Sequence, residues 1–161
     1  WQRMLDLNLT APFRCVRRAL PAMIERRHGR IVVIASVAAK IGEPYIAAYT
    51  ASKHGVLGMV RSAATEVATK GVTVNAVCPG YVDTPMTAQT IAEIVAKTGR
   101  TSEEARATLA PKQTHDRWDG VDDAAEGEDP VDEGAEAVIS CVRNGAINGQ
   151  GINVDGGGTT A

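Results

Sequence analysis

The sequence is poor in aromatic residues and in cysteine. Phe, Trp and Tyr make up 4% of the 161 residues, so a core must be built from Ala, Val, Ile and Leu. The three cysteines, Cys15, Cys78 and Cys141, lack the short spacing of metal ligands, and their odd number fits reduced thiols in a cytoplasm. Cys78 ends an apolar run, which predicts a buried thiol. The histidines show no ligand pattern either, and no metal site is expected.

Long apolar runs and an excess of one charge are also missing. The longest apolar run, IVVIASVAA, is far shorter than the ~20 residues of a transmembrane helix. A formal charge of -2 gives no reason to expect a nucleic-acid partner. Arginines gather between residues 14 and 30, but they surround an apolar stripe, which is typical of the solvated face of a helix. We therefore expect a cytoplasmic protein without a membrane or nucleic-acid partner.

Two long helices are predicted in the first half of the chain. Over residues 1–27 apolar side chains recur at helical spacing, and Asn8 near Pro12 marks a local break. A His-Gly pair at 28–29 is expected to cap this helix. A second helix, rich in small residues, is predicted from about 46 to 69.

Two uncharged stretches, IVVIAS and VTVNAVCPG, each follow one of these helices. Both are apolar throughout rather than alternating, which is typical of strands buried on both faces. The order helix, strand, helix, strand predicts a doubly wound α/β protein with a parallel sheet. In such sheets ligands bind beyond the carboxyl ends of the strands, which is where Ser36 and the Pro79-Gly80 turn are expected.

The second half of the chain is less regular. Residues 84–110 are predicted to be helical, with a cap at Thr101 or Ser102. Acidic residues dominate 111–136 and apolar ones nearly vanish, which predicts an exposed or disordered loop. A short helix is expected at AEAVISCV, and GQGINVDGGG is expected to form a last strand and a flexible tail.

One pair of residues could carry acid–base chemistry. Tyr49 and Lys53 are four residues apart, so both lie on one face of the predicted second helix. An ammonium close to a phenol lowers its pKa from about 10, and such a phenol can pass a proton to or from an alcohol or carbonyl oxygen. Ser36 could donate a hydrogen bond to the same oxygen, and Asn8 could hold a water that reaches the lysine. Singly, each residue is as easily structural, and Thr84 could simply cap a helix.

Together these residues resemble the catalytic half of a classical short-chain dehydrogenase/reductase. Ser36 in IVVIAS precedes Tyr49 in YTASK by 13 residues, which is the spacing typical of that family. Asn8 lies in NLT, and NAVCPGYVDTPM occupies residues 75–86. The motifs occur in the family's order, on matching predicted elements.

The resemblance covers residues 1 to about 110 and resumes at 147–157. It implies a Rossmann-type, NAD(P)-dependent oxidoreductase that interconverts a secondary alcohol and a ketone, most like members that act on 3-oxoacyl or hydroxyacyl substrates. It also implies NAD or NADP as cofactor, a homo-oligomer (dimer or tetramer), and a substrate lid over 84–110. The residues it assigns are Asn8, Ser36, Tyr49 and Lys53 for catalysis, and Tyr49, Lys53, Pro79, Gly80, Val82 and Thr84 for the cofactor.

Two features depart from the family. No Gly-x-x-x-Gly-x-Gly follows a strand, so the phosphate cradle of the family's opening βαβ unit is missing. Residues 1–161 are therefore predicted to be the C-terminal catalytic half of a single Rossmann-type domain. The acidic 111–136 stands where the family has a Gly-Arg turn and an apolar helix. A second hypothesis is a truncated, non-catalytic relative, an oligomerisation or interaction module that associates through helices 1–27 and 46–69.

Overall fold

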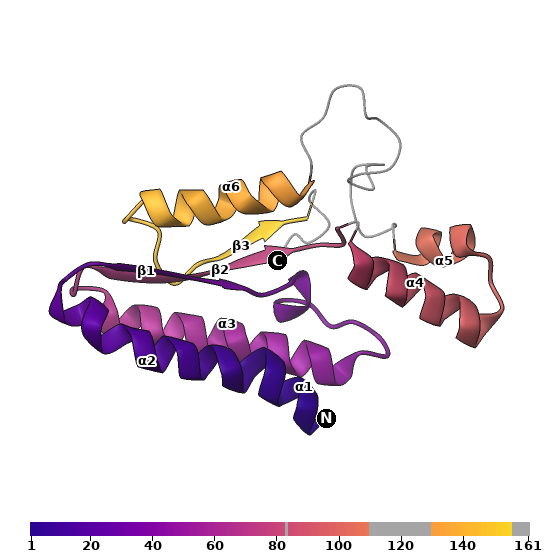
Figure 1. Ribbon diagram of the computed structural model, residues 1–161, viewed down its shortest axis with the longest axis horizontal. Helices are drawn as coiled ribbons and strands as arrows, with labels where there is room; N and C mark the ends of the chain where they lie inside the picture. The colour runs from indigo at the N-terminus through magenta and orange to yellow at the C-terminus, as the bar shows by residue number, and fades with distance from the viewer. Residues whose placement is uncertain (83, 110–129, 156–161) are drawn as a thin grey trace.

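The structure, a computed structural model, describes residues 1–82, 84–109 and 130–155. A parallel sheet lies between two layers of helices, with α6 on one face and α2 and α3 on the other (Figure 1). The predicted α/β architecture, with helices on both faces of a parallel sheet, is confirmed.

Among the residues that the structure describes, the sheet has three strands in the order β1-β2-β3, and all neighbours are parallel. β2 is buried along almost its whole length, as predicted for an apolar strand in the middle of a sheet. Burial on both faces is wrong for β1, where the Ile34 residue is 55% exposed. The reason is position: within the described residues β1 has a neighbour on one side only. The strands are β1 (Gly29–Ile34), β2 (Val72–Pro79) and β3 (Gly151–Val154).

One helical layer is made by the N-terminal helices and α3. Its core is aliphatic, as the scarcity of aromatic residues requires, and Val56 and Val60 of α3 pack fully buried against β2. The elements are α1 (Gln2–Leu5), a π-helical turn η1 (Asp6–Thr10), α2 (Ala11–Glu25) and α3 (Ala47–Val67).

The first helical region has the predicted break but not the predicted end. The break near Asn8 is the π-helical turn η1, which a single extra residue per turn produces. The predicted cap at 28–29 is wrong, because α2 ends at Glu25, Arg27 takes the left-handed conformation (φ 52°), and Gly29 already belongs to β1. The glycine serves close packing instead, since a Cβ there would lie 2.6 Å from the Met23 sulfur.

Within its described residues, the second half contains three helices, α4 (Pro85–Thr98), α5 (Ser102–Leu109) and α6 (Pro130–Arg143). The predicted cap at Thr101 is confirmed: its hydroxyl accepts the Glu104 N–H at 3.1 Å, and the Glu104 carboxylate accepts the Thr101 N–H at 2.8 Å.

The predicted acidic loop over 111–136 is wrong in its last part. Residues 110–129 lie outside the described residues, but α6 begins at 130, well before AEAVISCV. Asp132 and Glu133 occupy the first turn of α6, where negative charge stabilises the positive end of a helix. Some of the acidic residues therefore form the first turn of a helix. The high acidity of the whole segment predicts a loop and does not reveal this helix.

Two asparagines, the buried Asn75 and the partly buried Asn148, hold the segment before β3 against β2. The Asn75 side chain, which has no exposed surface, donates to the Ile147 carbonyl at 2.8 Å and accepts the Gln150 N–H at 3.1 Å. Asn148 accepts the Val74 N–H at 2.9 Å and donates to a carbonyl of α3 at 3.0 Å. Every polar atom of the Asn75 amide therefore faces a backbone partner from the incoming segment.

Over the parts of the chain that the structure describes, no helix has both the length and the apolar character that crossing a membrane demands. Within the same residues, His, Cys, Asp and Glu side chains do not gather into a group that could hold a metal ion.

Candidate active site

The carboxyl ends of β1 and β2 meet at one edge of the sheet, as expected. Just beyond β1, the Ala35 N–H donates to the Val77 carbonyl at 2.7 Å. Just beyond β2, the Gly80 N–H donates to the Val154 carbonyl of β3 at 2.9 Å. The first turn of α3 and the start of α4 lie at this same end of the sheet (Figure 1). Residues far apart in the sequence therefore come together at this edge.

Ser36 begins a short 3-10 helix, η2 (Val37–Ala39), immediately after β1. Its backbone is extended (φ -179°, ψ 160°), and its hydroxyl oxygen accepts the Ala38 N–H at 3.1 Å. The structural role of a strand-end serine is therefore real. It does not exclude a chemical one, because a hydroxyl that accepts one hydrogen bond still has its own proton to donate.

Tyr49 and Lys53 lie one turn apart at the start of α3, as predicted. The Lys53 Nζ is 5.5 Å from the centroid of the Tyr49 ring and donates a hydrogen bond to the Ile34 carbonyl at 3.1 Å. That carbonyl ends β1, two residues before Ser36. Partial burial lowers the pKa of Lys53, and the nearby Cys78 thiol has a smaller influence in the opposite direction.

Tyr81, just after β2, interacts electrostatically with Glu43 and with Tyr49. Burial raises the pKa of the half-buried Tyr81, and Glu43 and then Tyr49 raise it further. The sequence left open whether Tyr81 packs or contacts substrate. Glu43 carries no sequence signal at all, because only the folded loop before α3 brings it close to Tyr81.

Asn8 lies in the π-helical turn η1, and its amide nitrogen is 2.8 Å from the Met4 sulfur. The turn packs against α3, where Leu9 lies so close that a Cβ at Gly55 would be 2.8 Å from its Cδ2 atom. Within the described residues, no hydrogen bond joins Asn8 to Ser36, Tyr49 or Lys53. A catalytic role for Asn8 remains a prediction.

Besides Tyr49 and Lys53, the residues assigned to the cofactor lie at the end of β2 and just after it. Pro79 is the last residue of β2, and the Gly80 N–H donates a hydrogen bond to a carbonyl of β3. The Val82 carbonyl accepts the Thr87 hydroxyl at 2.6 Å. Thr84 caps α4, with its hydroxyl oxygen 3.4 Å from the Thr87 N–H. Thr84 therefore has the capping role that the sequence offered as an alternative, and its cofactor role stays a prediction.

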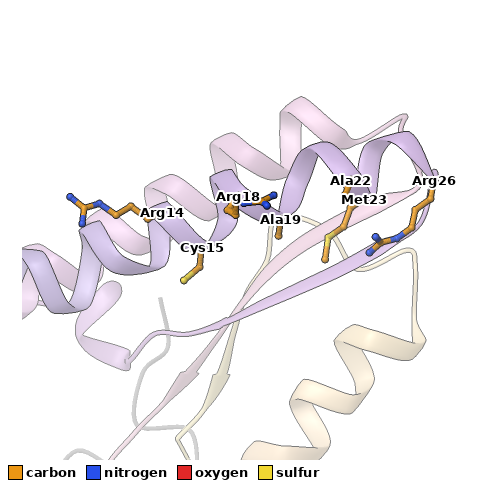
Figure 2. Close-up of a pocket in the computed structure, with 7 residues that line it drawn as sticks. All are labelled: Arg14, Cys15, Arg18, Ala19, Ala22, Met23 and Arg26. Carbon is orange, nitrogen blue, oxygen red and sulfur yellow. The ribbon is translucent and has the colours of Figure 1, made fainter.

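A hollow lies away from this edge of the sheet, along the side of α2 that faces β1 (Figure 2). It is formed by one stripe of the helix, and Asn8, Ser36, Tyr49 and Lys53 do not line it. The hollow is thus separate from the edge of the sheet where the titratable groups gather. Its lining residues are Arg14, Cys15, Arg18, Ala19, Ala22, Met23 and Arg26.

Comparison with known proteins agrees with this geometry. The sequence profile described as short chain dehydrogenase matches residues 1–95. This is more than half of the chain, and the chain belongs to the short-chain dehydrogenase family. The resemblance carried by the Ser-Tyr-Lys spacing and the Pro-Gly turn is therefore confirmed.

Two curated relatives illustrate the similarity. A D-beta-hydroxybutyrate dehydrogenase of Rhizobium meliloti (strain 1021) is 41% identical over 104 residues, which cover 65% of this chain and 40% of that protein. A 3-oxoacyl-(acyl-carrier-protein) reductase of Synechocystis sp. is 46% identical over 93 residues, which cover 58% of this chain and 38% of that protein. The chain thus spans about two fifths of the length of the curated relatives it matches.

Solved structures match over nearly the whole chain. Sorbitol-6-phosphate 2-dehydrogenase from Erwinia amylovora superposes with a TM-score of 0.85 at 28% identity, over 99% of this chain and 60% of that one. An actinorhodin polyketide ketoreductase solved with NADPH has a TM-score of 0.83 at 37% identity, over 98% of this chain and 59% of that one.

Proposed function

We propose that the protein is an NAD(P)-dependent oxidoreductase that interconverts a secondary alcohol and a ketone. The observation that carries this proposal is the link between α3 and β1: the Lys53 ammonium lies over the Tyr49 ring and is bonded to the Ile34 carbonyl. This link holds the ammonium at the end of β1, two residues before Ser36, at the edge of the sheet where α/β proteins bind ligands. The names of the relatives, which are dehydrogenases and reductases, support it.

The donors at this edge suit the nicotinamide end of NAD or NADP. An ammonium has three N–H donors, and only one of them is engaged by Ile34, so Lys53 can also bind ribose hydroxyls. The Thr84 hydroxyl and the backbone after Pro79 and Gly80 offer the polar groups that a carboxamide requires. The ketoreductase solved with NADPH supports this choice of cofactor.

A nicotinamide cofactor held by Lys53 and the residues after β2 would supply the hydride for the reduction of a ketone. The oxygen then gains negative charge and needs a proton. Tyr49 donates that proton from its phenol, and the neighbouring Lys53 ammonium stabilises the phenolate that remains. Ser36 donates a hydrogen bond to the same oxygen as the charge develops. In the oxidation of an alcohol, Tyr49 takes the proton back.

The substrate class that fits best is a 3-oxoacyl or 3-hydroxyacyl thioester. Relatives named as 3-oxoacyl reductase and putative ketoacyl reductase support this assignment. Residues 84–110, of which α4 and α5 form most, are proposed to cover the substrate. Tyr81, whose pKa is influenced by Tyr49, is proposed to contact the substrate.

The test uses the natural protein that carries this sequence, with acetoacetyl-CoA as substrate and NADPH or NADH as reductant. We expect oxidation of the reduced nicotinamide to depend on both, followed by its absorbance. Binding of the cofactor is measured separately by its fluorescence. A protein that neither binds nor oxidises the cofactor, yet forms a defined oligomer in solution, would instead support the non-catalytic association module.

The Lys53→Met variant tests whether Lys53 is needed for catalysis and not for folding. We expect kcat/KM to fall about a hundredfold, because the cation beside Tyr49 is lost. The free energy of unfolding at neutral pH should be unchanged or higher, because partial burial disfavours the Lys53 charge and the exposed Ile34 end of β1 can bind water.

The pH dependence of stability provides the control for this variant. Burial lowers the pKa of Lys53 in the folded state, so between that pKa and about 10.4 the unfolded protein binds more protons. Stability of the wild type should rise relative to Lys53→Met across this window.

Lys70→Met is the control for activity. It changes the same residue type in the turn after α3, away from the site, and should keep wild-type activity. An equal loss of kcat/KM in both variants would contradict the role of Lys53.

A further inference from the structure

A buried hydroxyl group lies at the start of α4, on the cofactor side of the candidate active site. Thr87 is in the first turn of this helix, which begins close to the end of β2 (Figure 1), and the residue is only 7% exposed. Removing a hydroxyl from water costs free energy unless the group finds a hydrogen-bond partner. The sequence pattern assigns no role to this residue.

The partner of Thr87 lies five residues earlier, before the helix begins. The Thr87 hydroxyl donates to the Val82 carbonyl at 2.6 Å. A threonine in a helix commonly bonds a carbonyl three or four residues earlier in the same helix, as Thr65 of α3 does with the Arg61 carbonyl at 3.0 Å. The Thr87 bond instead joins α4 to the segment between β2 and α4.

The bond to Val82 also determines how Thr87 can interact with Thr84. The two hydroxyl oxygens are 3.4 Å apart, and the Thr84 oxygen is 3.4 Å from the Thr87 N–H. A hydroxyl has one proton, and Thr87 gives its proton to Val82, so toward the Thr84 hydroxyl it can only accept. The contact between the two oxygens is long and therefore weak, so the Thr84 proton remains available to a ligand.

The same hydroxyl links α4 to the end of the sheet. Among the described elements, the main packing partner of α4 is α5, the next helix along the chain. Gly80, two residues before Val82, is held to β3 by its own N–H. The bond from Thr87 to Val82 therefore connects the two helices with a segment that the sheet already fixes at its other end.

We propose that Thr87 is a positioning residue for the nicotinamide end of the cofactor, an inference that rests on the proposed oxidoreductase function: its hydroxyl fixes the Val82 backbone and leaves the Thr84 hydroxyl proton for the carboxamide. A carboxamide has an acceptor oxygen and a donor NH2 group, so it needs protein groups held at fixed positions. Loss of the Thr87 bond weakens cofactor binding equally in the ground state and in the transition state. It should therefore raise KM and leave kcat unchanged.

The test compares Thr87→Val and Thr87→Ser with Thr65→Val, in the natural protein that carries this sequence. Valine keeps the branched shape of threonine and removes only the hydroxyl, whereas serine keeps the hydroxyl. Thr65 is the matched control because its hydroxyl is bonded within its own helix, on an exposed part of α3.

The first measurement is cofactor affinity, by fluorescence titration with NADPH. The dissociation constant should be about tenfold higher in Thr87→Val than in the wild type, and Thr87→Ser should recover most of the affinity. Thr65→Val should stay within about twofold of the wild type. With acetoacetyl-CoA as substrate, Thr87→Val should raise the KM for NADPH in parallel and change kcat by less than about twofold.

The second measurement needs no cofactor. The Ala88 N–H donates to the Thr84 carbonyl at 3.0 Å in the first turn of α4. Its exchange with solvent, followed by NMR, should become about tenfold faster in Thr87→Val and stay near wild type in Thr65→Val.

Equal NADPH affinity in Thr87→Val and Thr65→Val, or an unchanged exchange rate of Ala88, would overturn the proposal. A wild-type protein that binds no NADPH would refute the proposed function and with it the cofactor role of Thr87. The exchange rate of Ala88 would still show whether the Thr87 hydroxyl fixes the start of α4, so the two failures can be told apart.

Discussion

Tyr49→Phe should abolish turnover while leaving the fold intact. The substitution removes only the phenolic hydroxyl, which is the group proposed to give its proton to the substrate oxygen. We expect kcat/KM with acetoacetyl-CoA and NADPH to fall about a thousandfold. The aromatic ring remains, so the Lys53 ammonium keeps its place 5.5 Å from the ring centroid. The melting temperature should therefore stay close to that of the wild type.

The matched control is Tyr45→Phe. Tyr45 lies four residues before Tyr49, but the residue is wholly exposed, with a relative exposure of 103%. The same loss of a hydroxyl there should leave kcat/KM unchanged. Cofactor binding, read by nicotinamide fluorescence, should persist in Tyr49→Phe because Lys53 is retained. If Tyr49→Phe keeps more than about a tenth of the wild-type activity, Tyr49 is not the proton donor.

Asn75→Asp should cause the largest loss of stability, about 3–5 kcal/mol at neutral pH. The Asn75 amide donates to the Ile147 carbonyl and accepts the Gln150 N–H, and the residue has no exposed surface. A carboxylate keeps the acceptor but cannot donate, so it would face the Ile147 carbonyl as a buried charge. Because the Gly80 N–H is hydrogen-bonded to the Val154 carbonyl of β3, loosening this segment should also disturb the proposed cofactor site after β2.

The loss should depend on pH. Burial raises the pKa of a carboxyl group, so between about pH 4 and that raised pKa the folded variant binds more protons than the unfolded chain. Stability should therefore fall as the pH rises through this window, because the protonated acid can still donate to Ile147. Chemical denaturation at several pH values measures the effect.

Asn144→Asp provides the control for this variant. Its side-chain oxygen accepts the Ala146 N–H at 3.0 Å on the exposed surface, and a carboxylate can do the same. We expect a change of about 0.5 kcal/mol or less. Equal losses at Asn75 and Asn144 would show that the bonds to Ile147 and Gln150 do not hold β3 to β2.

The features that can be predicted from the sequence alone are those that depend on nearest neighbours along the chain. Tyr49 and Lys53 share a face because an α-helix has a fixed period, whatever it packs against. The cap at Thr101 follows from the spacing of a hydroxyl and a carboxylate three residues apart. β2 follows from a long run without charge, since only a strand covered on both faces removes such a run from water.

Which of these helices, strands and side chains contact one another is set by the tertiary structure. The hydrogen bond from Lys53 to Ile34 and the effect of Glu43 on the pKa of Tyr81 join residues that no local pattern relates. The errors have the same origin. The composition of β1 predicts burial on both faces, but it does not say how many neighbouring strands β1 has.

Gly29 shows the same limit in a single residue. A glycine after a helix suggests a cap, but this glycine is required by the Met23 side chain that packs against it. Local conformation is set by a few adjacent dihedral angles and can be predicted from the sequence. Burial, hydrogen-bond partners and pKa shifts depend on side chains that only folding brings within a few ångströms.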